Sequence, residues 1–281
     1  MRYQYNEPSG GILNLVIAEP TFERRFFQEK NRPLNAILWN RGATQTLTVD
    51  GLGIAFPANH LACLMVNQSF TLERPQDVVI WQFNRDFYCI IDHDEEVSCV
   101  GFLFYGWKDF MLIQLSGDET RRFDLLLQVF REEFEMHDSI QGEMLRMLLK
   151  RLIIKLTRLA KTQFLDGSLN EPELDIVRQF NLLVENNYKK LRQVQDYAAL
   201  LHKSPKTLSN LFSKYGEKSP LQIIQERVAM EGKRMLLFTG QSSSEIAYEL
   251  GFEEPAHFSR FFKKMVGQSP SEFKLAAKNG G

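Results

Sequence analysis

The chain has 281 residues, of which 44% are hydrophobic and 25% are charged, and its formal net charge is −1. This composition excludes a disordered or collagen-like chain, and the length is sufficient for two packed domains. No uninterrupted apolar run reaches the length that spans a bilayer, and the first ten residues lack an apolar signal core. We therefore expect a cytoplasmic protein with no membrane partner.

The near-zero net charge conceals an asymmetry along the chain. Residues 172–281 carry 16 Lys and Arg against 12 Asp and Glu, whereas residues 1–171 carry 18 against 23. A basic C-terminal part favours contact with phosphate groups, and an acidic N-terminal part favours a different partner.

Short strands are predicted in the N-terminal part, from about Leu34 to Leu115. Residues 43–49 are β-branched and alternating, and Asp50-Gly51 behind them is typical of a two-residue hairpin. Many short strands at close spacing predict a small barrel or a roll of two sheets. The further short runs are 61–65, 78–83, 97–105 and 111–115.

Two helices are predicted next, from about Asp118 to His137 and from Ser139 to Thr162. In the second helix, apolar residues follow one face and basic residues lie largely around the others. Two roles for the apolar face stay open, because it can pack against the strands of its own subunit or form a dimer contact. The dimer contact would use Leu145, Leu149, Leu152 and Leu156.

Neither the cysteines nor the histidines indicate a metal site. Cys63, Cys89 and Cys99 are an odd number without C-x-x-C spacing, which favours buried reduced thiols, with a redox pair of Cys89 and Cys99 as the alternative. The acidic cluster at 92–96 contains one His and offers ligands to a divalent ion, but a solvated turn is favoured because the chain has only five His. No phosphate-binding glycine loop or nucleophile motif is present, so no cofactor and no enzyme activity are expected.

A polar connector at residues 166–170 separates two predicted domains. Its last residue, Asn170, can cap a helix that has Pro172 in its first turn. We therefore expect one domain at 1–165 and a second domain at 171–281. Later Ser and Pro positions mark further helix starts, which predicts about seven helices in the second domain.

One pattern occurs twice in the second domain. Corresponding positions are 49 residues apart before a tight turn and 50 residues apart after it, and Pro205 or Pro255 opens the helix that follows the turn. This spacing predicts two tandem helix-turn-helix motifs, at about 194–216 and 244–266. The matched residues are Ala198, Leu201, Leu208, Phe212, Lys214, Ser219 and Pro220 in the first motif, and Ala247, Leu250, Phe258, Phe262, Lys264, Ser269 and Pro270 in the second.

The second helix of each motif has an apolar side and a polar side. The polar side is expected to enter the major groove, where the guanidinium of Arg260 can pair with both acceptors of a guanine edge. Lysines farther along the helices are expected at phosphates. The base-facing candidates are Lys206, Ser209, Asn210, Ala256, His257, Ser259 and Arg260, and the phosphate-facing candidates are Lys214, Lys263 and Lys264.

The stretch Glu245–Pro270, EIAYELGFEEPAHFSRFFKKMVGQSP, resembles the second helix-turn-helix motif of the AraC/XylS family of bacterial transcription regulators. The resemblance covers roughly residues 172–275. The first motif departs from the family form at His202, which stands where the second motif has Gly251. A His tolerates the left-handed backbone of a tight turn less readily than a Gly does.

The resemblance implies a regulator, more often an activator than a repressor, that binds promoter DNA and contacts RNA polymerase. Family members often carry a cupin-like β-barrel and a pair of dimerisation helices ahead of this domain. The resemblance therefore implies an α+β two-domain homodimer whose barrel senses a small-molecule effector. Two alternatives stay open: a cupin-type metal-dependent enzyme fused to the DNA-binding module, and a regulator whose N-terminal domain binds a protein.

A helix from Pro220 to about Phe238 is predicted to join the two motifs. At 1.5 Å per residue it spans about 28 Å, less than the roughly 34 Å between successive major-groove segments of straight DNA. Two recognition helices at this separation can both enter the major groove only if the duplex bends. Because bending costs free energy, we expect binding through the second motif alone to compete with binding through both motifs.

Overall fold

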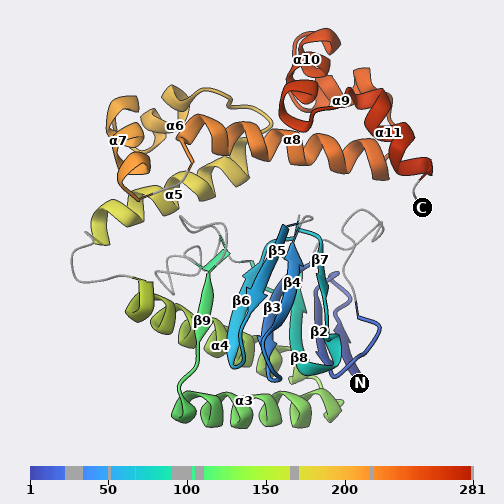
Figure 1. The fold of residues 1–281 in the computed structure, drawn as a ribbon, viewed down its shortest axis with the longest axis vertical. Helices are drawn as coiled ribbons and strands as arrows, with labels where there is room; N and C mark the ends of the chain where they lie inside the picture. The colour runs from blue at the N-terminus through green and yellow to red at the C-terminus, as the bar shows by residue number, and fades with distance from the viewer. Residues whose placement is uncertain are drawn as a thin grey trace. The chain divides into compact units, whose positions relative to one another are not determined.

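The structure is a computed structural model that describes residues 1–22, 34–49, 52–66, 68–89, 103–104, 111–164, 171–215 and 218–279. The chain divides into two compact units, and the boundary falls between helices α4 and α5. In the described residues, strands β1 to β9 and helices α3 and α4 belong to the first unit, and the second unit is helical (Figure 1). The prediction of an α+β protein with two domains is confirmed at this level.

Six strands of the first unit form an antiparallel sheet in the order β1-β2-β8-β3-β6-β9. Strands β1 and β2 precede the region where the sequence predicts strands. Every residue of β2 except the last is buried, so both faces are covered and no polar alternation marks the strand. The bounds are β1 Arg2–Asn6, β2 Ile12–Ile17, β3 Asn35–Asn40, β6 His60–Leu64, β8 Val78–Phe83 and β9 Leu112–Gln114.

A second sheet has three strands in the order β5-β4-β7, with bounds β4 Gln45–Val49, β5 Leu52–Phe56 and β7 Phe70–Leu72. The predicted hairpin is confirmed by the pairing of Val49 with Leu52, while its turn, Asp50-Gly51, lies outside the described residues. One buried apolar cluster contains residues of both sheets. Among the described strands no pairing joins the two sheets, so they form two sheets and not a closed barrel.

One predicted strand differs from the structure. Most of residues 97–105 lie outside the described residues, but Leu103 and Phe104 are helical, so the strand prediction is wrong at these two positions. Both side chains are buried, and the Phe104 ring packs edge-on against Phe83, with 5.9 Å between ring centroids. An apolar run as short as this one does not separate a buried strand from a buried helix.

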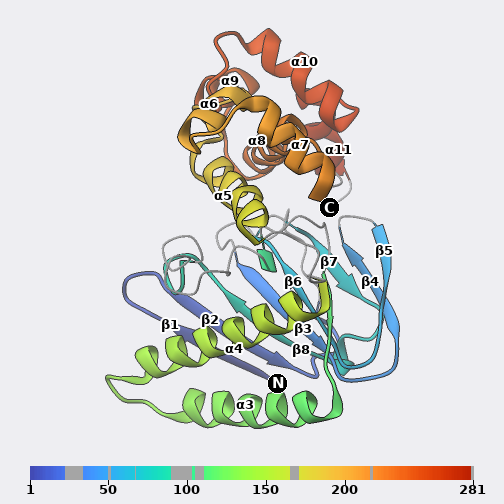
Figure 2. The ribbon, with the colours of Figure 1, turned by 90° about the vertical axis from the view of Figure 1, so that its left-hand side faces the viewer.

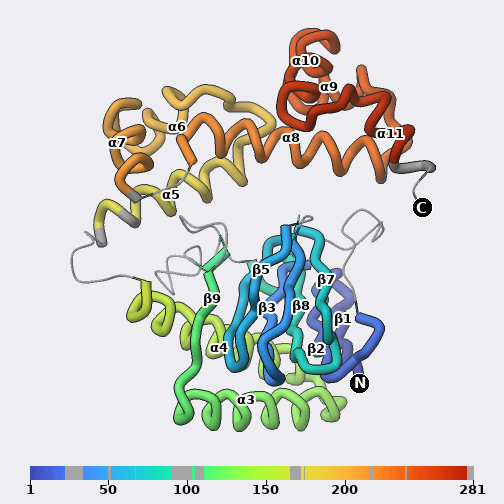
Figure 3. Tube along the Cα trace, in the orientation of Figure 1, coloured from blue at the N-terminus to red at the C-terminus, as the bar shows by residue number. Residues whose placement is uncertain are grey.

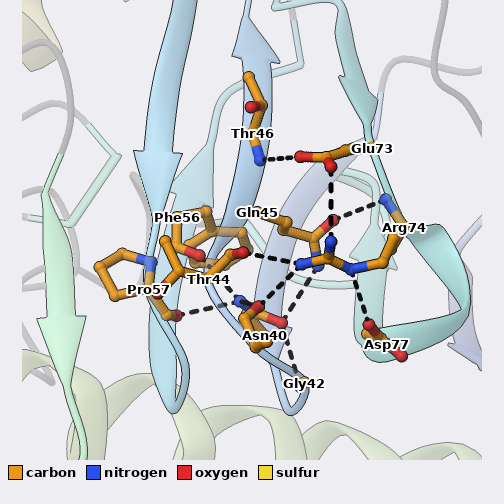
Figure 4. Close-up of polar contacts among 11 residues, drawn as sticks. Asn40, Gly42, Thr44, Gln45, Thr46, Phe56, Pro57, Glu73, Arg74 and Asp77 are labelled. Atoms are coloured by element: carbon orange, nitrogen blue, oxygen red, sulfur yellow. Dashed lines mark hydrogen bonds and ion pairs between the residues drawn. The ribbon is translucent and has the colours of Figure 1, made fainter.

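A polar corner ties the end of β3 to the smaller sheet (Figure 4). The fully buried Asn40 side chain donates to the carbonyl oxygen of Phe56 at 2.8 Å and accepts from Nε2 of Gln45 at 3.1 Å. The backbone N–H of Arg74 donates to Oε1 of Gln45 at 2.9 Å, and Arg74 Nη2 donates to the carbonyl oxygen of Thr44 at 2.7 Å. Because the buried side chains of Asn40 and Gln45 find their hydrogen-bond partners here, the corner is structural.

Helices α3, Gly117–Glu135, and α4, Gln141–Phe164, lie side by side against the six-stranded sheet (Figure 2). They match the two predicted helices, with ends shifted by one or two residues. The ring of Phe123 packs against Trp39 with 6.1 Å between centroids, and the ring of Phe130 packs against Trp81 at 5.9 Å. This outer face of the sheet is therefore covered by α3 and α4.

The apolar face of α4 belongs to the core of the unit. The four leucines predicted as a dimer contact are fully buried within one chain, so that role is wrong for them and the alternative of intramolecular packing holds. A second copy cannot reach side chains that are already covered by their own subunit. These residues are Leu145, Leu149, Leu152 and Leu156.

The second unit has seven helices among its described residues, in agreement with the prediction. Helix α8 is the longest, with α6 and α7 toward its N-terminal end and α9, α10 and α11 toward its C-terminal end (Figure 3). Its bounds coincide with those predicted for the connecting helix. The helices are α5 Glu171–Asn187, α6 Val194–Leu200, α7 Pro205–Tyr215, α8 Pro220–Phe238, α9 Ser243–Glu249, α10 Pro255–Val266 and α11 Pro270–Asn279.

Serine side chains cap the N-termini of several of these helices. Ser219 Oγ accepts from the backbone N–H of Gln222 at the start of α8, and Ser242 and Glu245 form a complete capping box at the start of α9. The predicted connector, 166–170, lies outside the described residues. Among the helices that the structure describes, none has the length and apolar character needed to cross a membrane.

Candidate nucleic-acid interface

The two predicted turns begin with the same backbone structure, although the second turn is one residue longer. His202 and Gly251 both have a positive φ, 52° and 77°, so the first motif places a His in the left-handed conformation that the second assigns to a Gly. The N–H that follows each of them donates back to the small Ala of the preceding helix: Lys203 to Ala198 and Phe252 to Ala247, both at 2.9 Å. Two short helices, α6 and α9, therefore end in equivalent turns 49 residues apart.

The helix after each turn buries its predicted apolar side. Leu208 and Phe212 of α7 and Phe258 and Phe262 of α10 are at most 2% exposed. In the second motif these side chains join a cluster with α8 and α9 that also includes Leu250. The apolar side of each helix therefore packs against the other helices of the domain. The opposite side of each helix does not belong to the core.

The base-facing candidates lie on this opposite side. All of them are exposed except Ser259, which is half-buried. Ser209 Oγ donates to the carbonyl oxygen of Pro205 in its own helix, which occupies its hydroxyl hydrogen. The others on the free sides of α7 and α10 are Lys206, Asn210, Ala256, His257 and Arg260.

The phosphate-facing lysines do not have equivalent surroundings. Lys214 Nζ lies 2.7 Å from Oε2 of Glu173 on α5, so a carboxylate already neutralises it. Lys263 and Lys264 are exposed in the last turn of α10. The second motif therefore presents the stronger positive potential at its helix end.

The second turn is held by contacts that no sequence motif indicated. The Phe252 ring packs against Phe258 and Phe261, with 5.3 Å between centroids in both pairs. The guanidinium of Arg192 also lies over this ring, with its Cζ 3.5 Å from the Phe252 centroid. Arg192 belongs to the segment before α6, far from the second motif in sequence, so no local pattern could identify this contact.

The residues considered for a metal or redox site lie partly outside the described ranges. No group of three or more His, Cys, Asp or Glu that could hold a metal lies in the ranges that the structure describes, and the acidic cluster at 92–96 falls outside them. Cys89 is buried, and burial raises the pKa of the Cys63 thiol well above its usual range. Cys99 lies outside the described residues, so its predicted pairing with Cys89 has no geometry to report.

Comparisons with known proteins identify the C-terminal domain. A family described as a helix-turn-helix domain matches residues 197–276. The regulator YisR of Bacillus subtilis is 24% identical over 181 residues, which are 60% of this chain and 62% of that protein. The arabinose operon regulatory protein of Escherichia coli is 28% identical over 136 residues, 47% of this chain and 44% of that protein.

Among solved structures, ToxT of Vibrio cholerae is similar with a TM-score of 0.47 and 16% identity, over 96% of each chain. The chain spans less than two thirds of the length of the curated relatives named above, both of which are described as regulators. The family match covers both turns and both exposed helices described above. The chain therefore carries a helix-turn-helix domain with two tandem motifs, and it is similar to transcription regulators of the AraC/XylS family.

Proposed function

We propose that the chain regulates transcription by placing α7 and α10 in two successive major-groove segments of one promoter duplex. The observation that carries this proposal is the repetition of one turn, with matching left-handed residues and backbone hydrogen bonds, in front of two helices whose polar sides are exposed. Helix-turn-helix proteins read DNA with the second helix of such a unit.

On α10, Arg260 contacts a base and Lys264 contacts a phosphate. Arg260 lies on the exposed side of the helix, where its planar guanidinium can form two hydrogen bonds with a guanine edge. Lys264 lies one turn farther along, at the end of the helix, and serves as a phosphate contact that carries no sequence information. On α7, Lys206 and Asn210 take the corresponding base-facing positions.

Selection of binding sites from random duplexes with the full chain tests this proposal. The expected product is an asymmetric site with two conserved blocks about 10 base pairs apart. Titration of the selected duplex and a scrambled duplex should show at least about a thousandfold preference. Failure to enrich any sequence would contradict the proposed function.

We further propose that the first unit is a cupin-like sensing domain for a small-molecule effector. Asn14 on β2 is 2% exposed, and its Oδ1 has no hydrogen-bond partner among the described residues. A buried polar atom normally has a partner, and the donor group of a ligand would supply one. A thermal-shift screen of small polar compounds against the wild-type chain and Asn14→Leu tests this, because a ligand should stabilise only the wild type.

A homodimer is proposed through the outer side of α3 and α4, in place of the buried leucines. Large apolar side chains remain exposed there: Leu125 at 63%, Val129 at 41%, Met144 at 39% and Met147 at 64%. A second copy related by a two-fold axis would cover these side chains with the same patch.

Charge along this helix pair supports the two-fold arrangement. Four exposed Arg residues lie in the first half of α3 and the second half of α4, and four exposed acidic residues lie toward the turn between the helices. Arg131 and Asp118, which pairs with Arg121, are exceptions to this separation. Two antiparallel copies would therefore set the basic end of each against the acidic end of the other. The basic residues are Arg121, Arg122, Arg151 and Arg158, and the acidic residues are Glu132, Glu135, Asp138 and Glu143.

Within this proposal the protein acts in the cytoplasm, contacts RNA polymerase at the promoter and activates transcription without enzymatic chemistry. YisR and the arabinose operon regulatory protein, two of the relatives that the chain matches, are described as regulators. Transcription from a selected site placed upstream of a reporter should rise when the chain and polymerase are both present.

A further inference from the structure

The two helix-turn-helix motifs are joined by a second connection besides α8. Residues Tyr188–Arg192 link α5 to α6 and so stand directly in front of the first motif. Three of these residues contact the second motif, more than 40 residues away in sequence. We call the segment Tyr188–Arg192 the brace.

Lys189 contacts the second motif through both its side chain and its backbone. Its Nζ lies 2.8 Å from Oε1 of Glu249, and the other oxygen of that carboxylate accepts from Gln241 Nε2 at 2.8 Å. Its carbonyl oxygen lies so close to Gly251 that a Cβ there would approach within 3.0 Å of it. The salt bridge is exposed and contributes little by itself, whereas the backbone contact requires a glycine in the turn.

Arg192 contacts the residues on either side of Gly251. Its Nη2 donates to the carbonyl oxygen of Leu250, and its guanidinium stacks on the Phe252 ring, with Cζ 3.5 Å from the centroid. The helical hydrogen bonds of α9 end at this point, so the guanidinium satisfies a carbonyl left free by the turn. Through Phe252 and its contacts with Phe258 and Phe261, Arg192 is linked to the recognition helix α10.

Tyr188 anchors the other end of the brace. Its ring packs against the apolar cluster of the second motif, and Cζ of Arg227 on α8 lies 3.9 Å from its centroid. Arg227 also bonds to Glu185 of α5 at 2.8 Å and to Glu231 of α8 at 3.3 Å. The end of α5, the middle of α8 and the second motif therefore meet at one ring.

We propose that the brace fixes the orientation of the two motifs relative to each other, and that Arg192 is a positioning residue for DNA recognition. The inference rests on the proposed function. Helix α8 by itself sets the separation of the motifs along its axis, whereas contacts at the second turn also resist rotation about that axis. The brace opposes the state in which the second motif binds DNA while the first is displaced.

The rigidity of the two motifs relative to each other can be tested by changing the number of base pairs between the two blocks of the selected site. Insertion of two base pairs between the two blocks of the selected site rotates one block by about 70° relative to the other. The wild-type chain should lose at least about tenfold in affinity, because its motifs cannot follow the rotation. Arg192→Met should bind the original site about tenfold more weakly than the wild type and lose less than about threefold on the insertion.

Two further variants complete this test. Lys190→Met removes one positive charge from the same segment at an exposed side chain, so it should keep the spacing dependence of the wild type. Arg192→Lys keeps the charge but loses the planar group that stacks on Phe252, and it should behave like Arg192→Met. If Arg192→Met retained both the wild-type affinity and its spacing dependence, the brace proposal would be wrong.

A measurement without DNA separates the brace from the proposed function. Spin labels attached through ketone-bearing amino acids at Ser213 on α7 and Lys263 on α10, both exposed, report the distance between the motifs in the full chain. The wild type and Lys190→Met should give one narrow distance distribution, and Arg192→Met a clearly broader one. Identical narrow distributions would overturn the brace, whereas failure of site selection with a broadened Arg192→Met distribution would overturn only the proposed function.

Discussion

Gly251→Ala tests the most constrained position in the second motif. The backbone of Gly251 has φ 77°, a conformation that costs an L-residue about 1–2 kcal/mol. The added Cβ would also lie less than 3.0 Å from the carbonyl oxygen of Lys189, an approach that folded proteins essentially never show. Because that oxygen belongs to the backbone, the turn or the brace must move.

The free energy of unfolding of the C-terminal unit should fall by about 1–3.6 kcal/mol. This figure adds about 1–2 kcal/mol for displaced packing to the conformational cost, and subtracts about 0.4–1 kcal/mol because Ala lowers the entropy of the unfolded chain. Hydrogen exchange of the full chain, followed by mass spectrometry on peptides of α9 and α10, measures the change. Protected amides should exchange roughly 5- to 400-fold faster.

His202→Ala is the matched control. His202 occupies the equivalent turn with φ 52°, and it already carries a Cβ there, so Ala introduces no new atom beside the backbone. Exchange in α6 and α7 should change by less than about threefold. If Gly251→Ala left exchange in α9 and α10 equally unaffected, the reasoning from the left-handed turn and its close contact would be refuted.

Five other changes give distinct outcomes. Arg260→Ala should cost about 1–3 kcal/mol of binding free energy on the selected site and relax the preference at one base pair. Lys264→Ala should instead weaken binding to all duplexes alike and flatten the salt dependence of the affinity. Equal losses of affinity on specific and random DNA for Arg260→Ala would show that Arg260 does not read a base. Leu152→Glu buries a charge in the core and should unfold the first unit, seen by circular dichroism, whereas Met147→Glu should leave a folded monomer in sedimentation. Burial alone would raise the pKa of Glu231, but the hydrogen bond from Arg234 and the charge of Arg227 outweigh it and lower that pKa. The stability from Glu231 is therefore present above about pH 4.3 and is lost as pH falls through the lowered folded pKa, and Glu231→Gln should flatten this part of the acid-unfolding curve.

The helix-turn-helix motifs could be predicted from the sequence because their signals are local. The small Ala, the turn and the Pro that opens the next helix lie within a few residues of one another, and their repetition confirms the register. The left-handed backbone at His202 also follows from its alignment with Gly251. Helix α8 begins at Pro220 and ends at Phe238, as predicted. Its start could be predicted because Ser219 caps it and Pro220 fits its first turn.

Other features depend on contacts between distant segments. The periodicity of α4 predicts a buried face but does not say whether the same chain or a second copy covers it, so the role of Leu152 could not be decided. Strand β2 is buried on both faces and lacks the alternation that marks a half-buried strand. Arg192 lies outside any periodic element, and its contact with Phe252 exists only in the folded unit.

Hydroxyl-radical footprinting of the full chain on a selected duplex tests the central claim, that one chain reads DNA with both α7 and α10. The connecting helix α8 spans about 28 Å, so both motifs engage only if the duplex bends toward them. The account predicts two protected segments about one helical turn apart on a duplex that circular-permutation mobility shows to be bent. A single protected segment, or two segments on straight DNA, would contradict it.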